Sequence, residues 1–386
     1  MSSPVKRLAI LGSTGSIGQQ TLDIVRAFPQ RFRIVGLAAG KNLDLLTRQI
    51  DEFKPDFACY DPANCSSSKV QACLNVPRCQ FISREEIASH PDADLVVIAT
   101  AGKAGLSPTL AAVKAGKRIA LANKESLVMA GAIITRELKK TGATIIPVDS
   151  EHSAIWQCLN GEKQKAARII LTASGGPFYR FTSSQLAGVT VEQALTHPSW
   201  KMGKKVTIDS ATMMNKGLEV MEAHWLFGMP YDCISILVHP ECIVHSMVEF
   251  VDGMVKAQMG CPDMRLPIQY ALSYPQRLDN PQLPRIDWGK LRKLTFEPPD
   301  MARFPCLKMA LAAAKSGDTY PVVLATADEL AVELFLAGRI KFTDIASLIE
   351  KALERHQPRH APGLEEIMAA DAWTKETVLK LAGGEK

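Results

Sequence analysis

The sequence predicts an α/β chain in three parts: a doubly wound parallel sheet, a central α+β domain and a small C-terminal helical domain. In residues 1–150 short apolar runs alternate with amphipathic stretches, residues 151–274 combine loops rich in Ser, Gly and Pro with alternating runs, and residues 306–386 have helical periodicity. Residues 275–305 are too rich in proline for regular elements and are expected to form a linker. With 386 residues and 47% apolar content, the chain can bury a substantial core.

The first part follows a strand–helix alternation. Strands buried on both faces are expected at 7–12, 32–39, 57–60, 95–100, 118–122 and 144–148. Helices are expected between them, at 19–28, 42–53, 105–116 and 126–142. Such alternation is typical of a parallel, Rossmann-like sheet with helices on both faces.

The remaining elements are of two kinds. In the central part, residues 168–178 and 233–253 predict an exposed or self-pairing sheet, and residues from Met214 onward predict a helix. Four helices are expected in the C-terminal part, at 306–317, 322–338, 342–356 and 363–383.

Composition and charge exclude several classes of function. The formal charge of +5 is modest and is not concentrated in one basic tract, so we expect small anionic ligands and no nucleic acid. Polar residues interrupt every apolar run, so we expect no membrane span. The N-terminus runs directly into the first strand, which leaves no room for a targeting segment and predicts a bacterial cytoplasmic protein. A mature organelle form trimmed of its leader would look similar. The nine cysteines include no CxxC pair.

A glycine-rich turn joins the first strand to the first helix. Gly12, Gly15 and Gly18 have a G-x-x-G-x-x-G spacing, a variant of the dinucleotide fingerprint. Glycines of this kind let the backbone approach a pyrophosphate at the positive end of the helix. Ordinary turn glycines are the alternative.

The end of the second strand bears on the choice of cofactor. An enzyme that uses NAD usually has an acid there for the ribose hydroxyls, whereas this chain has Gly40, Lys41 and Asn42. A lysine would attract a 2′-phosphate, so the sequence favours NADP. An exposed loop lysine would look the same.

Carboxylates follow the strand at 144–148. Asp149 and Glu151 come at its end, and Glu219 lies on the polar side of the helix expected from Met214. Three carboxylates form a set of oxygen ligands, which suits Mg²⁺ or Mn²⁺. The alternative is a solvated strand tip and a solvated helix face.

Two further stretches offer groups that bind anions. Ser174 lies in a glycine turn, and Ser210, Asn215 and Lys216 supply hydroxyl, amide and ammonium donors close to a helix start, as in phosphate sites. Helix capping is the alternative for Ser210.

The basic loop at 196–205 contains a tryptophan and a glycine, and such a loop is able to close over an anionic substrate. A plain solvated loop is the alternative.

Taken together, the motifs GSTGSIG, ANKES, VDSEHSAIWQ, TASGGPF, HPSWKMG and DSATMMNKGLE resemble those of the 1-deoxy-D-xylulose 5-phosphate reductoisomerases. The resemblance covers essentially the whole chain, with the motifs in the family's order and spacing, although the C-terminal helices match only in character. It implies the NADPH-dependent step of the non-mevalonate isoprenoid pathway, a small sugar phosphate as substrate and a homodimer.

Matching motifs imply roles for particular residues. NADPH would be bound by Thr14, Gly15, Ser16, Ile17, Gly40, Lys41, Asn42, Asn123, Glu125 and Gly203. The metal would be held by Asp149, Glu151 and Glu219, and the phosphate by Ser174, Ser210, Asn215 and Lys216. Lys124, Ser150 and His197 would contact the substrate near its reacting carbons, and Trp200 and Met202 would belong to a mobile flap. Glu151 is the candidate for a second role as proton shuttle.

Two rival functions are considered. Another NADPH dehydrogenase, for instance of an amino-acid semialdehyde, would share only the first domain and would need no divalent metal. A non-catalytic NADPH-sensing or scaffold protein would keep the glycine turn and typically lose the acids.

Overall fold

The computed structural model describes residues 4–60, 79–197, 200 and 202–383. Contacts between residues divide the chain into two compact units. The first unit comprises residues 1–126, 134–153 and 263–284, and the second comprises residues 127–133, 154–262 and 285–386. The four segments expected from the sequence, with boundaries at 150, 274 and 305, stay a prediction.

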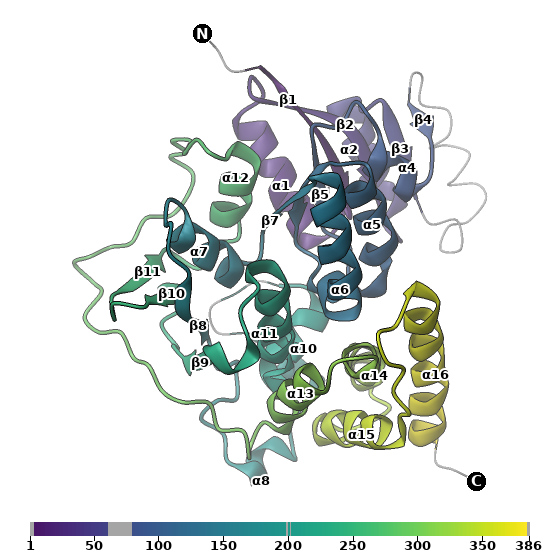
Figure 1. The fold of residues 1–386 in the computed structure, drawn as a ribbon, viewed down its shortest axis with the longest axis vertical. Coiled ribbons are helices and arrows are strands. Elements are labelled where there is room, and N and C mark those ends of the chain that lie inside the picture. Colours follow the sequence, from purple (N-terminus) through teal and green to yellow (C-terminus); the bar gives the residue numbers. More distant parts are fainter. Residues whose placement is uncertain (1–3, 61–78, 198–199, 201, 384–386) are drawn as a thin grey trace. The chain divides into compact units, whose positions relative to one another are not determined.

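The first unit contains a parallel sheet of seven strands (Figure 1). The strands are β1 (Lys6–Leu11), β2 (Phe32–Ala38), β3 (Phe57–Cys59), β4 (Gln80–Phe81), β5 (Leu95–Ile98), β6 (Arg118–Leu121) and β7 (Thr144–Pro147). Their order is β4-β3-β2-β1-β5-β6-β7, which places the reversal of a doubly wound sheet between β1 and β5. All six predicted strands are confirmed, and the two-residue β4 was missed because so short a strand has no periodicity.

Helices connect these strands. They are α1 (Ser16–Ala27), α2 (Leu43–Phe53), α4 (Arg84–Ser89), the short η2 (Gly102–Gly105), α5 (Leu106–Lys114) and α6 (Lys124–Thr141), and α12 (Arg265–Ser273) packs against α1. The four predicted helices are confirmed. The sequence analysis missed α4, a helix of six residues that a capping box between Ser83 and Glu86 stabilises at its start.

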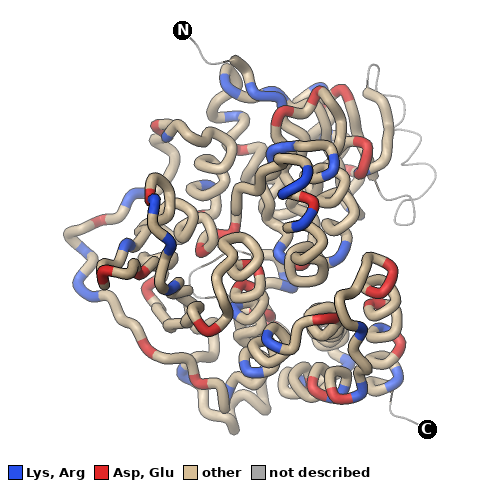
Figure 2. The backbone as a smooth tube through the Cα atoms, in the orientation of Figure 1, with Lys and Arg blue, Asp and Glu red and all other residues tan. Residues whose placement is uncertain are grey.

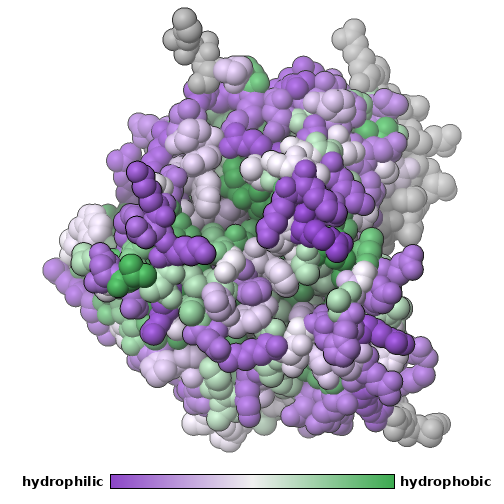
Figure 3. All heavy atoms as spheres, in the orientation of Figure 1, coloured by the Kyte–Doolittle hydropathy of each residue, from purple (hydrophilic) through white to green (hydrophobic). Residues whose placement is uncertain are grey.

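The second unit contains a sheet of four strands in the order β11-β10-β8-β9. The strands are β8 (Ala166–Ala173), β9 (Ile234–Val238), β10 (Val244–Phe250) and β11 (Val255–Met259). Among the described strands of this sheet, only β8 and β9 pair in parallel, so the sheet is mixed. Hydrophobic side chains reach the surface over β10 and β11 (Figure 3), where Val251 and Met254 are 75% and 67% exposed.

The helices that follow α6 begin with α7 (Ser150–Leu159). In the second unit the chain forms α8 (Ser183–Leu186), α9 (Val191–Ala194), α10 (Lys204–Thr212), α11 (Met214–Phe227), η3 (Tyr231–Cys233), α13 (Pro305–Ser316), α14 (Tyr320–Leu336), α15 (Phe342–Arg355) and α16 (Leu364–Gly383). The four predicted C-terminal helices and the helix from Met214 are confirmed. On α11, Met214, Leu218 and Met221 are fully inaccessible.

Charge is distributed along the whole chain. Acidic and basic positions alternate along the backbone of both units and do not form one basic tract (Figure 2), in agreement with the formal charge of +5. No helix among the described residues is both long enough and apolar enough to cross a membrane.

Candidate active site

The glycine turn after β1 has the geometry of a dinucleotide loop. Gly12 has a φ of +88°, and a Cβ at that position would lie 2.4 Å from the carbonyl oxygen of Ala99, just after β5. A Cβ at Gly18 would lie 2.2 Å from the carbonyl oxygen of Gly12. Only glycine therefore allows α1 to begin this close to the turn, at the point where the strand order reverses.

The start of α1 is suited to an anion. Its N-cap is Gly15, no side chain caps it, and its first turn contains no acid. The amides of the first turn and the positive end of the helix dipole therefore remain for a ligand. Beneath the turn, Ser13 and Gln49 are buried and hydrogen-bonded to each other, the Ser13 hydroxyl donating to Oε1 of Gln49 over 2.7 Å.

Two amides expected at the cofactor act as helix caps. Oδ1 of Asn42 accepts a hydrogen bond from the amide of Leu45 at the start of α2. Asn123 is 1% exposed, caps α6, and donates to the carbonyl oxygens of Thr100 and Gly102 over 2.9 Å each. The Asn123 side chain therefore ties the end of β6 to the loop after β5. Lys41 is exposed beside Asn42.

Next to the carboxyl end of β7, charged and polar side chains are paired. Nζ of Lys124 lies 2.5 Å from Oδ2 of Asp149, which joins the first residue of α6 to the end of β7. The Ser150 hydroxyl donates to Oε2 of Glu151 over 2.6 Å. Lys124 is only 7% exposed, so its ammonium is placed beside the carboxylate in a region with little water.

A second set of polar groups surrounds Glu219 on α11. Nδ2 of Asn215 and Nζ of Lys216 each lie 2.5 Å from a different oxygen of this carboxylate. Lys216 also donates to the carbonyl oxygen of Thr172 near the end of β8, over 2.5 Å. Glu219 and its neighbour Glu222 are 0% exposed, so the alternative of a solvated helix face is wrong for both.

The glycine turn that contains Ser174 lies against the backbone of Ser210. Gly176 has a φ of +70°, and a Cβ there would lie 2.4 Å from the carbonyl oxygen of Ser210. The glycine turn that contains Ser174 therefore packs directly on the last turn of α10. Ser210 does not cap α11, whose N-cap is Met213, so helix capping does not account for this serine. Gly176 was not predicted as a site residue, although its signal, the pair Gly175–Gly176, is present in the sequence.

His197 is oriented by two neighbours. Its Nδ1 accepts a hydrogen bond from the amide of Trp200 over 2.9 Å, so the neutral ring has its proton on Nε2, which lies 3.0 Å from the Ser174 hydroxyl oxygen. Burial lowers the pKa of His197 and so favours this neutral form. Trp200 also contacts the ring of His245. Pro198, Ser199 and Lys201, which belong to the predicted flap, lie outside the described residues.

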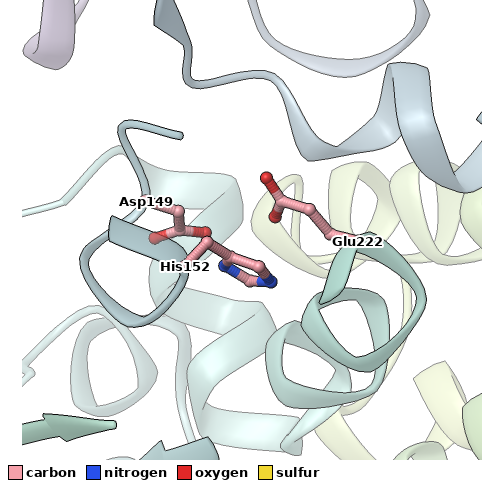
Figure 4. A group of neighbouring side chains, drawn as sticks. All are labelled: Asp149, His152 and Glu222. Carbon is pink, nitrogen blue, oxygen red and sulfur yellow. The ribbon is translucent and has the colours of Figure 1, made fainter. Parts of the chain in front are cut away.

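Two groups of side chains among the described residues have a spacing suited to a metal ion, and the predicted ligands form one of them. Ligand atoms of Asp149, Glu151 and Glu219 lie within 4.8 Å of one another, and so do those of Asp149, His152 and Glu222 (Figure 4). The first group offers oxygen ligands only, the set that Mg²⁺ prefers, whereas the second contains an imidazole. His152 and Glu222 were not predicted as site residues.

The fold and the glycine turn define a class: oxidoreductases that use a nicotinamide dinucleotide. Family models extend this assignment along the chain. The model of 1-deoxy-D-xylulose 5-phosphate reductoisomerase matches residues 8–131, that of its C-terminal domain matches residues 145–227, and that of the DXP reductoisomerase C-terminal domain matches residues 259–377. The chain belongs to the 1-deoxy-D-xylulose 5-phosphate reductoisomerase family.

The chain is also similar to individual relatives along nearly their whole length. The chain is 50% identical to the reductoisomerase of Pelotomaculum thermopropionicum, over 98% of each chain, and 51% identical to that of Chlorobaculum tepidum, over 98% of this chain and all of the relative. A solved DOX-P reductoisomerase in complex with NADPH, fosmidomycin and magnesium is 42% identical, with a TM-score of 0.92 over 99% of this chain and all of the other. The enzyme of Zymomonas mobilis in complex with NADPH is 40% identical, with a TM-score of 0.89 over 98% and 99%.

Proposed function

We propose that this chain converts 1-deoxy-D-xylulose 5-phosphate to 2-C-methyl-D-erythritol 4-phosphate, with NADPH and a divalent cation, Mg²⁺ or Mn²⁺. The observation that carries the proposal is the 50% identity to a reductoisomerase over 98% of both chains. A dehydrogenase that shared only the first domain would not match family models at residues 145–227 and 259–377, so that rival is not favoured. The solved relative with NADPH and magnesium supports both cofactors.

All the proposed cofactor residues except Gly203 belong to the first unit. The uncapped start of α1 binds the pyrophosphate, and Lys41 binds the 2′-phosphate. The other proposed contacts are Thr14, Gly15, Ser16, Ile17, Gly40, Asn42, Asn123, Glu125 and Gly203. Because the Asn123 side chain is engaged within the protein, its contact with NADPH is assigned to the backbone.

Asp149, Glu151 and Glu219 are the proposed metal ligands. When bound, the cation supplies Lewis-acid stabilisation of the negative charge that develops on the substrate oxygens. The ammonium groups of Lys124 and Lys216 offset part of the repulsion among the acids, since each lies 2.5 Å from one of them. Lys124, Ser150 and His197 contact the substrate close to the reacting carbons.

The phosphate of the substrate is assigned to Ser174, Ser210, Asn215 and Lys216. The Ser174 oxygen accepts from Gly176 N–H and lies beside Nε2–H of His197, so its own proton is left to donate to a phosphate oxygen. Binding the phosphate away from the reacting carbons orients the ketose for carbon–carbon cleavage and rejoining. Closure of the flap with Trp200 and Met202 then excludes water before hydride transfer to the aldehyde.

A homodimer in the bacterial cytoplasm completes the proposal. The edge strand β11 and the turn before it present Val251, Met254 and Val255 to solvent, 75%, 67% and 47% exposed. An apolar sheet edge of this kind is suited to burial against a second copy. The bacterial sources of the relatives support the cytoplasmic location.

Chelation is the direct test of this function. In an assay that follows NADPH absorbance with 1-deoxy-D-xylulose 5-phosphate, EDTA should abolish oxidation and excess Mg²⁺ or Mn²⁺ should restore it, because the substrate oxygens lose their Lewis acid. NADPH binding, measured by fluorescence, should be unchanged by EDTA, since the glycine turn contains no ligand for the metal. Oxidation that continues in EDTA would contradict the proposal, and the absence of turnover in Mg²⁺ and Mn²⁺ would favour a non-catalytic NADPH binder.

Cofactor preference tests Lys41. Lys41→Ala should raise the Kd for NADPH about tenfold and leave the Kd for NADH unchanged, because only NADPH has the 2′-phosphate that an ammonium binds. Lys114→Ala is the matched control. This exposed lysine ends α5, which runs back toward the start of β6. Lys114 therefore lies at the opposite end of the strands from Lys41. Equal effects of Lys41→Ala on both cofactors would refute the assignment.

A further inference from the structure

A buried group of charged side chains joins α10 to α14 within the second unit. Nζ of Lys205, in the first turn of α10, lies 2.5 Å from Oδ2 of Asp209, one turn further along the same helix. The same ammonium lies 2.9 Å from Oδ2 of Asp328 on α14. The side chains of Asp209 and Asp328 are 2% and 0% exposed, so Lys205 bridges two buried carboxylates.

Burying these charged groups costs free energy, which packing of the two helices alone would not require. Asp209 and Asp328 place two carboxylates in the interior, where charges are poorly solvated. Oδ1 of Asp328 has no hydrogen-bond partner among the described residues. Apolar side chains would hold two helices together at lower cost, whereas a charge pair selects one position of one helix on the other.

The two carboxylates also act on a neighbouring thiol. Cys306, at the start of α13, is fully buried, and burial together with the charges of Asp328 and Asp209 raises the pKa of its thiol. The two carboxylates therefore act on the same small region, in which α10, α13 and α14 pack together.

Helix α10 has proposed functional residues at both ends. It begins after Gly203, which directly follows the flap residue Met202, and its last turn contains Ser210, the residue after Asp209. Met213, with a φ of +63°, ends the helix, so α10 is a separate segment of nine residues and not an extension of α11. Lys205 is paired at the first turn and Asp209 at the last, so the cluster spans the helix.

We propose that Asp328 is a positioning residue: through Lys205 its carboxylate fixes α10, and thereby holds Ser210 in place for the substrate phosphate and holds the end of the flap at Gly203. The C-terminal helices thus take part in substrate binding without contacting the substrate. The inference rests on the proposed assignment of Ser210 to the phosphate.

Steady-state kinetics of Asp328→Ala test the proposal. Alanine removes the tether and leaves Lys205 paired with Asp209, so no unpaired charge remains in the interior. KM for 1-deoxy-D-xylulose 5-phosphate should rise about tenfold, with kcat changed less than about threefold, because a displaced phosphate site weakens binding more than the chemical step.

The second unit offers a matched control in Asp371→Ala. Asp371 on α16 is also a buried carboxylate, 2% exposed, which lies 3.5 Å from Lys375 and accepts a hydrogen bond from Thr326 of α14 over 3.0 Å. This variant should lose thermal stability with no change in KM. A wild-type KM in Asp328→Ala, or an equal rise in Asp371→Ala, would overturn the proposal.

Two further variants, Lys205→Gln and Ser210→Ala, distinguish failure of the proposed tether from failure of the phosphate assignment. Lys205→Gln should raise KM as Asp328→Ala does. The double variant should raise KM no further than either single variant, because both residues belong to one tether. Lys205→Gln also replaces Asp328→Ala if that variant does not fold. Additive increases would overturn the proposal. If Ser210→Ala raises KM and Asp328→Ala does not, only the present proposal fails. An unchanged KM in Ser210→Ala overturns the phosphate assignment and the proposal with it.

Discussion

Glu151→Gln is expected to lower kcat about 10³-fold, because the substitution removes a charged metal ligand and the proposed proton shuttle together. The amide is nearly the same size as the carboxylate and still accepts a hydrogen bond from Ser150, so the fold should be unchanged. The Kd for NADPH should also be unchanged, since no contact of Glu151 reaches the glycine turn in the proposed arrangement. Turnover of 1-deoxy-D-xylulose 5-phosphate and fluorescence titration with NADPH measure the two quantities.

Glu162→Gln is the control for this experiment. Glu162 lies shortly after α7, the helix in which Glu151 occupies the first turn, and forms a partly exposed ion pair with Lys256. Surface ion pairs contribute little to stability, so this variant should keep wild-type turnover. Full activity in Glu151→Gln would eliminate both of its proposed roles.

Gly18→Ala is expected to raise the Kd for NADPH about 100-fold, because the start of α1 must move away from the turn that cradles the pyrophosphate. The added Cβ would lie 2.2 Å from the Gly12 carbonyl oxygen and 2.5 Å from Cα of Ser13, both of them backbone atoms that cannot rotate away. Overpacking of this kind also costs about 1–3 kcal/mol of folding stability, which thermal unfolding would detect.

Gly188→Ala provides the matched comparison. This glycine lacks a positive φ, and the nearest atom to an added Cβ would be the Gln185 carbonyl oxygen at 3.9 Å, an ordinary contact. Its Kd for NADPH should equal that of the parent protein. A Gly18→Ala variant that binds NADPH normally would show that the turn is not the pyrophosphate site.

The strand and helix pattern was largely readable from the sequence. Six apolar runs became strands of one parallel sheet, because strands covered on both faces have continuous apolar sequences that stand out from the amphipathic helices. The elements that were not predicted include α10 and α12, of nine residues each, and also β4 and α4, of two and six residues, which are too short for periodicity to show. For α4 a local signal, the capping box of Ser83 and Glu86, was available.

The candidate site was only partly readable. Residue types and spacing were enough to nominate Asp149, Glu151 and Glu219, but not to exclude a solvated helix face for Glu219, since amphipathic periodicity does not reveal what covers a polar stripe. The full burial of Glu219 and its contacts with Asn215 and Lys216 settled that alternative. His152 and Glu222 were passed over for the same reason: their burial is a tertiary property.

By itself, then, the sequence determined the alternation of elements, the glycine turn and the family resemblance, because these depend on residues that are neighbours along the chain. Only the tertiary structure decided which groups meet: the Lys216 ammonium with the Thr172 carbonyl oxygen, Ser174 with His197, and Lys205 with Asp328. Those contacts join residues far apart in sequence. Their energies come from burial and from pairing of charges within a packed interior, which no local pattern specifies.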